Sequence, residues 1–182
     1  MKQETKKIKR VIFERYYIEL NRANQVCQDL IIERVDFIMY CKQIDIERND
    51  EIAEMRRLRG LYNNKLRLYK SDFEFHSFKE FYYWHLKTFE KQNGECYYCH
   101  TRESTIATLF KKKFVSAKRR TRGMHLEVER KDSEGNKYSP ENCVLSCYFC
   151  NNDKSDVFTE EEYRRYLKNR KQFFDDEYKK LS

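Results

Sequence analysis

The sequence predicts an α+β fold, in which a mainly helical chain carries one small unit of two strands and a helix. Only four glycines and one proline occur in 182 residues, which favours long helices over a loop-rich all-β chain. Between two pairs of cysteines, residues 124–130 alternate apolar and polar side chains, which is typical of a strand. Turn-forming residues in 133–142 and the short run CVLSC follow, and they complete a pair of strands.

The N-terminal region, residues 1–70, is predicted to be helical. Apolar residues recur at three- and four-residue steps over 8–42, which predicts one long helix. A second helix is expected over 50–59 and should end at Gly60, with 60–72 as the connector. The stripe of the first helix is Leu20, Ala23, Cys27, Leu30, Ile31, Val35, Ile38 and Cys41, whose two cysteines are expected to be small core residues. Together the two helices would form a helical hairpin. This helical hairpin can be a packing layer, a homodimerisation element or an arm that contacts DNA, and the apolar periodicity does not choose among these.

The second domain, residues 71–182, is predicted to open with a helix that begins after Ser77. Glu80 lies three residues further on, so the two form a capping box. The helix should end at the sequence QNG in 92–94. His85 lies inside this helix, where a histidine is more often a packed residue than a catalyst.

A last helix is predicted to begin at Thr159, with Glu162 in the capping-box position. One face of this helix carries the apolar side chains, which are expected to be buried. These residues are Tyr163, Tyr166, Leu167, Phe173, Phe174 and Tyr178.

The charge distribution favours a nucleic-acid partner. The net charge is +8, and the run FKKKFVSAKRRTRG in 110–123 holds seven lysines or arginines and no acid. A solvated surface is the simpler alternative, since charge runs often have no partner. The expected phosphate contacts are Lys111, Lys112, Lys113, Lys118, Arg119, Arg120, Arg122 and Lys154. The N-terminus lacks the apolar segment of a signal peptide, so a cytoplasmic protein without a membrane span is expected.

The cysteines predict a metal site. Four of the seven form two C-x-x-C pairs, Cys96 with Cys99 and Cys147 with Cys150. Thiolates at this spacing suit Zn²⁺ in a closed tetrahedral site, whereas a redox pair is usually found in a βαβ setting that is absent here. Four thiolates leave no position for water, so this zinc should be structural and any chemistry must lie elsewhere.

The segment from CYYC to LEVERKDSEGNKYSPENCVLSCYFCNNDKS, roughly residues 90–157, resembles the HNH endonucleases. These form the ββα-metal, treble-clef class, and the likeness is to the branch stapled by four cysteines around zinc. The resemblance implies a Mg²⁺- or Mn²⁺-dependent endonuclease that hydrolyses phosphodiester bonds in nucleic acid, with double-stranded DNA as the expected substrate.

Three residues occupy functional positions of that family. The resemblance implies that Glu129 and Asn151 are ligands of the catalytic divalent ion. It also implies that the Asn142 amide ties the connecting loop together and so holds the end of the first strand. Each residue alone has a simpler interpretation, as a surface acid, a helix cap and a turn residue. Their joint spacing around two cysteine pairs favours the functional interpretation.

The sequence departs from the family where a histidine base is usual, because Arg130 holds that position. Arginine stays protonated, so it cannot accept the proton of the attacking water. An acid-Arg-x-Asp sub-pattern of the family matches better and adds Asp132 and Tyr138 to the site. In such a site Arg130 would neutralise charge on the scissile phosphate.

The proton acceptor is left open by the sequence. Asp132 and Tyr138 are the nearer candidates, and His100 or a hydroxide on the divalent ion are alternatives. His125 precedes Glu129 by four residues on the predicted strand, which is about 13 Å and too far to share one water.

Two rival functions also fit. Arg130 at the base position is compatible with a catalytically inactive zinc-stapled protein that binds nucleic acid. A protein-interaction module built on the N-terminal helices is the third alternative.

Overall fold

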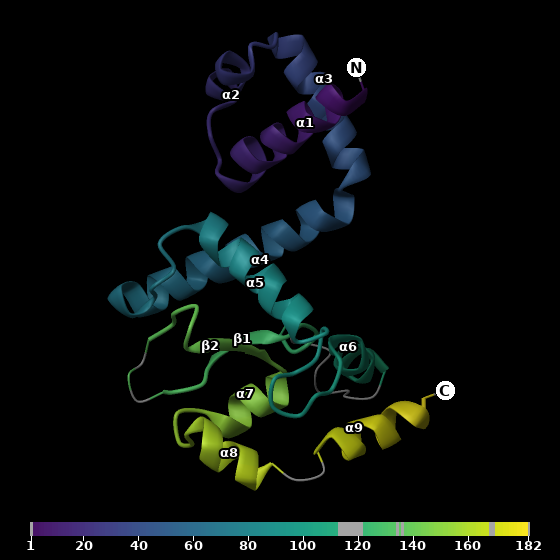
Figure 1. The fold of residues 1–182 in the computed structure, drawn as a ribbon. Coiled ribbons are helices and arrows are strands. Elements are labelled where there is room, and N and C mark those ends of the chain that lie inside the picture. Colours follow the sequence, from purple (N-terminus) through teal and green to yellow (C-terminus); the bar gives the residue numbers. More distant parts are fainter. Residues whose placement is uncertain (1, 113–121, 134, 136, 168–169, 182) are drawn as a thin grey trace. The chain divides into compact units, whose positions relative to one another are not determined.

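The computed structural model describes residues 2–112, 122–133, 135, 137–167 and 170–181, and the chain divides into two compact units. Unit 1 is Met1–Leu68 with His76–Tyr82, and unit 2 is Tyr69–Phe75 with Tyr83–Ser182. The predicted α+β class is confirmed, because a mainly helical chain carries one two-stranded antiparallel sheet (Figure 1). In the described part of the chain, no helix is long and apolar enough to cross a bilayer.

Unit 1 is built from helices that meet around aliphatic and aromatic side chains. Its elements in order are α1 (Lys2–Ile12), a π-helical turn (Phe13–Ile18), α2 (Ala23–Leu30), α3 (Arg34–Glu47), α4 (Asn49–Tyr69) and the start of α5 (Phe78–Lys91). Ile12, Ile44 and Leu58 are fully buried in this core. The Tyr62 ring lies 5.8 Å from the Phe78 ring, which packs the start of α5 on α4.

The long helix predicted over 8–42 is wrong, because the chain turns twice within it. Leu20 and Ile31 have φ angles of 60° and 55°, in the left-handed region that ends a helix. Residues other than glycine rarely adopt this conformation, so the apolar spacing continues across both breaks without revealing them. As a result Leu20, Ile31 and Val35 are exposed instead of buried.

The predicted helix end at Gly60 is also wrong. α4 runs through this glycine to Tyr69, and a short 3₁₀ turn, Lys70–Asp72, follows. An added Cβ at Gly60 would meet nothing within 4 Å, so the position is an ordinary exposed helical site. Residues 60–69 of the expected connector are therefore helical.

Unit 2 carries the two strands and the cysteines. After α5 come α6 (Glu103–Lys112), β1 (Glu127–Arg130), β2 (Cys143–Ser146), α7 (Tyr148–Lys154), α8 (Glu160–Tyr166) and α9 (Arg170–Lys179). β1 and β2 are antiparallel, with Glu127 opposite Ser146 and Arg130 opposite Cys143. α7 follows β2 directly and packs against β1 (Figure 1).

The capping predictions hold better than the helix lengths. The Glu80 amide donates to Ser77 Oγ at 3.1 Å, although the Glu80 carboxylate accepts from His76 instead of Ser77. Thr159 and Glu162 form the complete predicted capping box. The single last helix is wrong, because α8 and α9 are separate.

The burial of residues 159–178 also differs from the predicted apolar stripe. Tyr163 and Phe174 are buried, whereas Tyr166, Phe173 and Tyr178 are exposed. One continuous stripe is therefore not formed. His85 is buried in α5, as expected of a packed residue.

Candidate metal centre and acidic strand

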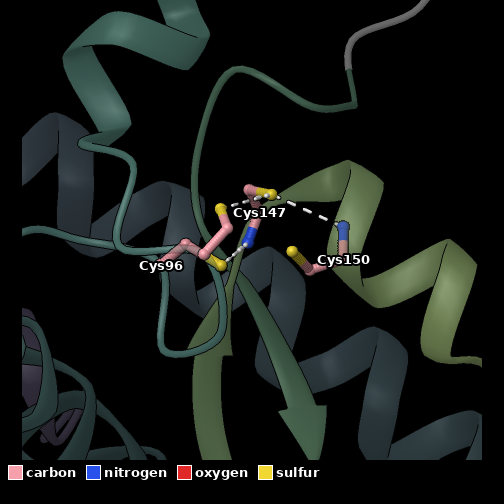
Figure 2. A group of neighbouring side chains, drawn as sticks. Cys96, Cys147 and Cys150 are labelled. Carbon is pink, nitrogen blue, oxygen red and sulfur yellow. Dashed lines mark hydrogen bonds between the residues drawn. The ribbon is translucent and has the colours of Figure 1, made fainter. Parts of the chain in front are cut away.

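The four predicted cysteines converge. Cys96 and Cys99 come from the loop after α5, while Cys147 caps α7 and Cys150 lies in its first turn. Figure 2 shows Cys96 beside Cys147 and Cys150 at the start of this helix. All four are buried, and their sulfur atoms lie within 4.8 Å of one another. The Sγ atoms of Cys99 and Cys147 are 3.8 Å apart. Tetrahedral zinc with Zn–S bonds near 2.3 Å requires sulfur separations of about 3.8 Å, so the spacing fits a metal ion.

Local hydrogen bonds prepare these sulfurs as ligands. The backbone amide of Cys147 donates to Cys96 Sγ at 3.2 Å, and that of Cys150 donates to Cys147 Sγ at 3.4 Å. The four sulfurs shift one another's pKa values in opposite directions. Hydrogen bonding to Cys147, then to Cys150 and Cys96, lowers the pKa of Cys99, whereas hydrogen bonding to Cys150, then to Cys96 and Cys99, raises the pKa of Cys147. Metal ligation requires thiolates. Among the described residues, these four cysteines are the only cluster of three or more cysteine, histidine or acidic side chains that could hold a metal ion.

A second centre lies where α7 meets β1. Glu127 and Glu129 are two residues apart on β1, so they project from the same face of the strand. Asn151 Nδ2 donates a short hydrogen bond to Glu127 Oε2. Lys154 Nζ lies 3.5 Å from Glu129 Oε1. Each acid of β1 therefore has a partner from α7.

The predicted pair, Glu129 and Asn151, thus lies on two elements that face each other. The residue that Asn151 contacts is Glu127, which the family pattern did not assign. The alternation in LEVE could have indicated it, because a strand that places Glu129 on one face places Glu127 there too.

Lys154 is not the surface phosphate ligand that the sequence predicted. Its side chain is 0% exposed, and Glu129 beside it is 5% exposed. A lysine is almost never buried unless it is paired, and here the Glu129 carboxylate offsets its charge. The ammonium also donates to Ser133 Oγ at 3.2 Å.

Asn142 ties together the loop between the strands. Its Nδ2 donates to the carbonyl oxygens of Asp132 and Lys137, both at 2.8 Å, and its Oδ1 accepts from the Asp132 amide at 2.9 Å. The backbone is thereby held across the end of β1. Asp132 itself is exposed at this end.

Arg130 lies on the opposite face of β1 from Glu129, as strand alternation requires. Its guanidinium lies 4.8 Å from the centre of the Tyr138 ring and 5.9 Å from that of Tyr69. Burial, followed by a hydrogen bond with Tyr69, raises the pKa of Tyr138 well above its ordinary value. The role of Tyr138 as a proton acceptor stays a prediction.

The two histidines considered as proton acceptors, His100 and His125, lie outside β1. β1 begins at Glu127, so His125 precedes it and is not on the same strand face as Glu129. His125 Nδ1 is 3.4 Å from a carboxylate oxygen of Glu103. His100 is an exposed residue with φ of 56° in the turn after Cys99.

The described basic residues are only partly available to a ligand. Lys111 and Lys112 are exposed at the end of α6. Arg122 is exposed but makes two hydrogen bonds of 2.7 Å to the Glu127 carboxylate. The remaining predicted contacts, Lys113, Lys118, Arg119 and Arg120, lie outside the described residues.

Comparison with known proteins adds no assignment. No protein family, no curated protein and no solved structure matches this chain. The cysteine cluster and the contacts between α7 and β1 are therefore the features from which a function can be inferred.

Proposed function

We propose that the chain is a metal-dependent endonuclease that hydrolyses phosphodiester bonds in nucleic acid, with double-stranded DNA as the expected substrate. One observation carries the proposal. α7 begins in the cysteine cluster and presents Asn151 to the face of β1 that bears Glu127 and Glu129. In this proposal the cluster holds α7 so that the Asn151 amide lies beside carboxylates that are distant in sequence.

Zn²⁺ is the metal that we propose for the cysteine cluster. Four buried sulfurs at tetrahedral spacing suit a soft-ligand structural site and leave no coordination position for water. In this proposal the zinc fixes the first turn of α7, and it takes no part in hydrolysis.

The donors at the acidic strand fit Mg²⁺ or Mn²⁺, which prefer oxygen ligands. Glu129 and Asn151 would hold the ion. Because Asn151 gives its Nδ2 to Glu127, its Oδ1 is the atom that remains for a cation. When bound, such an ion lowers the pKa of water and offsets charge on the phosphate.

The protein's own residues would hold and orient the substrate. The proposed reaction is in-line attack of water on phosphorus, in which the bond from phosphorus to one sugar oxygen breaks and that oxygen leaves as a hydroxyl after it takes a proton from solvent. Asn142 fixes the loop at the end of β1, and Asp132, exposed in that loop, is the proton acceptor that we propose. Three basic side chains would contact the phosphates of the nucleic-acid backbone, namely Arg130, Lys111 and Lys112.

Nicking of supercoiled plasmid in Mg²⁺ or Mn²⁺ tests the proposal. We expect the wild type to nick, and Glu129→Ala to be slower by about a hundredfold, since it loses a metal ligand. Glu74→Ala is the matched control, because Glu74 is an acid whose side chain forms an ion pair with Lys137 and belongs to neither β1 nor α7. Equal cleavage by Glu129→Ala and the wild type would exclude Glu129 from the reaction.

A second candidate is a zinc-stapled protein that binds nucleic acid without cutting it. The contact between Lys154 and Glu129 favours this candidate, because an ammonium already neutralises the carboxylate that would bind the divalent ion. Binding in a gel-shift assay, with no nicking in either metal, would support it over the nuclease. Self-association through the N-terminal helices is a separate proposal, which the molecular mass in solution tests.

A further inference from the structure

The buried lysine of α7 lies where the proposed catalytic cation would bind. Lys154 is fully buried, and its ammonium lies 3.5 Å from Glu129 Oε1 and 3.2 Å from Ser133 Oγ. A buried ammonium loses its hydration, and the opposite charge of a nearby carboxylate compensates for that loss. Lys154 is therefore bound to the same carboxylate that a divalent ion would need.

The position of Lys154 on α7 follows from that of Asn151. The two residues are three apart on the helix, so their side chains share one face. Glu127 and Glu129 are two apart on β1 and share the facing side. Asn151 meets the first acid and Lys154 meets the second, so the helix sets an amide and an ammonium opposite two carboxylates.

Among Glu127, Glu129 and their two cationic partners, the charges balance without a metal ion. Arg122 neutralises Glu127 through two hydrogen bonds, and Lys154 neutralises Glu129. A divalent ion added while Lys154 stays in place would leave two uncompensated positive charges in a buried region, which is unfavourable. If the ammonium leaves, a single positive charge remains, and one phosphodiester anion neutralises it.

We propose that Lys154 is the resident cation of the Glu129 centre and that a divalent ion binds there by displacing it. This inference rests on the proposed function, because it concerns the same carboxylate. The long, flexible side chain of lysine allows the ammonium to move without unfolding α7. Exchange lowers the affinity for the ion when no substrate is present, and the phosphate of a bound nucleic acid restores it.

Mn²⁺ titration followed by electron paramagnetic resonance tests the exchange without measuring cleavage. The experiment uses the whole chain of 182 residues, loaded with zinc. Lys154→Met removes the competing cation and leaves the Glu129 charge uncompensated, so we expect it to bind Mn²⁺ about tenfold more tightly than the wild type. Lys137→Met is the control, because this exposed lysine pairs with Glu74; its Mn²⁺ affinity should equal that of the wild type.

A milder variant covers the case in which Lys154→Met does not fold. Ser133→Ala removes one hydrogen-bond acceptor of the ammonium at a half-buried loop position. It should bind Mn²⁺ more tightly than the wild type, by about two- to fivefold, the equivalent of a typical hydrogen bond. Adding Glu129→Gln to either Lys154→Met or Ser133→Ala should abolish the gain in Mn²⁺ affinity.

The outcomes separate the exchange from the function on which it rests. Tighter Mn²⁺ binding by Lys154→Met that disappears with Glu129→Gln supports displacement. Glu129-dependent Mn²⁺ binding that is equal or weaker in Lys154→Met overturns the exchange and leaves the divalent-ion site intact. If no protein binds Mn²⁺ through Glu129, the exchange and the metal-dependent nuclease are both overturned.

Discussion

At the scale of single residues, the partners of the two acids decide what β1 can do. Glu127 is held by Arg122 and Asn151, and Glu129 lies against Lys154. A carboxylate in this setting is held in one orientation, which suits a metal ligand and also suits a structural ion pair. A metal ligand differs from a structural ion pair in whether the ammonium beside Glu129 can be exchanged for a divalent ion.

Asn142 offers a prediction that concerns stability. Asn142→Ala removes three side-chain hydrogen bonds that hold the loop at the end of β1. At about 1 kcal/mol each, their loss should lower the free energy of unfolding by about 3 kcal/mol. Urea denaturation measures this change. Asn152→Ala is the control, because Asn152 makes one exposed hydrogen bond to the Tyr148 carbonyl and should cost far less.

The sequence predicted some of these residues and missed others for a physical reason. The cysteine quartet could be predicted, because paired thiolates at C-x-x-C spacing have few alternative uses in a chain of this kind. The inward direction of Lys154 could not be predicted, because it depends on how α7 docks on β1. The same holds for the contact between Asn151 and Glu127, which requires the strand and the helix to be placed first.

At the scale of elements, local signals outperformed periodicity. The pair of strands and the capping box at Thr159 were predicted from a few adjacent residues. The structure contains both, the first as the antiparallel pair β1–β2. The breaks at Leu20 and Ile31 were missed, because neither is a glycine although both adopt the left-handed conformation. α6 was also missed, because no helix was predicted over Glu103–Lys112 and its last three residues were assigned to the basic run in 110–123.

The capping box of α8 leads to a pH-dependent prediction. Hydrogen bonds from the Thr159 backbone and hydroxyl lower the pKa of Glu162. A carboxyl group whose folded-state pKa is depressed adds stability above its unfolded pKa, near 4.3, and this contribution is lost as the pH falls through the folded-state value. Thr159→Ala should therefore raise the pKa of Glu162 and lower the melting temperature more at pH 7 than at pH 3.

NMR titration of the Glu162 carboxyl group and thermal melts at the two pH values measure both effects. Thr108→Ala is the control, because Thr108 donates to the Ser104 carbonyl within α6 and has no carboxylate partner there. If the melting temperature of Thr159→Ala falls equally at the two pH values, the ionised Glu162 does not contribute to the cap.

At the scale of the whole molecule, the two units differ in what stabilises them. Unit 1 has its own aliphatic core, which includes Ile12, Ile44 and Leu58. In unit 2, the loop after α5 and the start of α7 are joined at the four buried cysteines. Metal binding in small zinc domains contributes about 10–16 kcal/mol, which is comparable with the whole stability of a typical protein, about 5–15 kcal/mol. Removal of the proposed zinc should therefore affect unit 2 far more than unit 1.

Hydrogen exchange after treatment with a zinc chelator measures this difference. Backbone amides of 95–101 and 143–154 should lose protection, because their segments are joined through the cluster. Amides of α4 near Leu58 should keep theirs, since that helix packs in the core of unit 1. Cys147→Ser should reproduce the effect and bind less zinc, whereas Cys27→Ser, altered in unit 1, should retain the metal. Equal loss of protection in both units would mean that the chain unfolds as a single cooperative body and that the metal stabilises all of it.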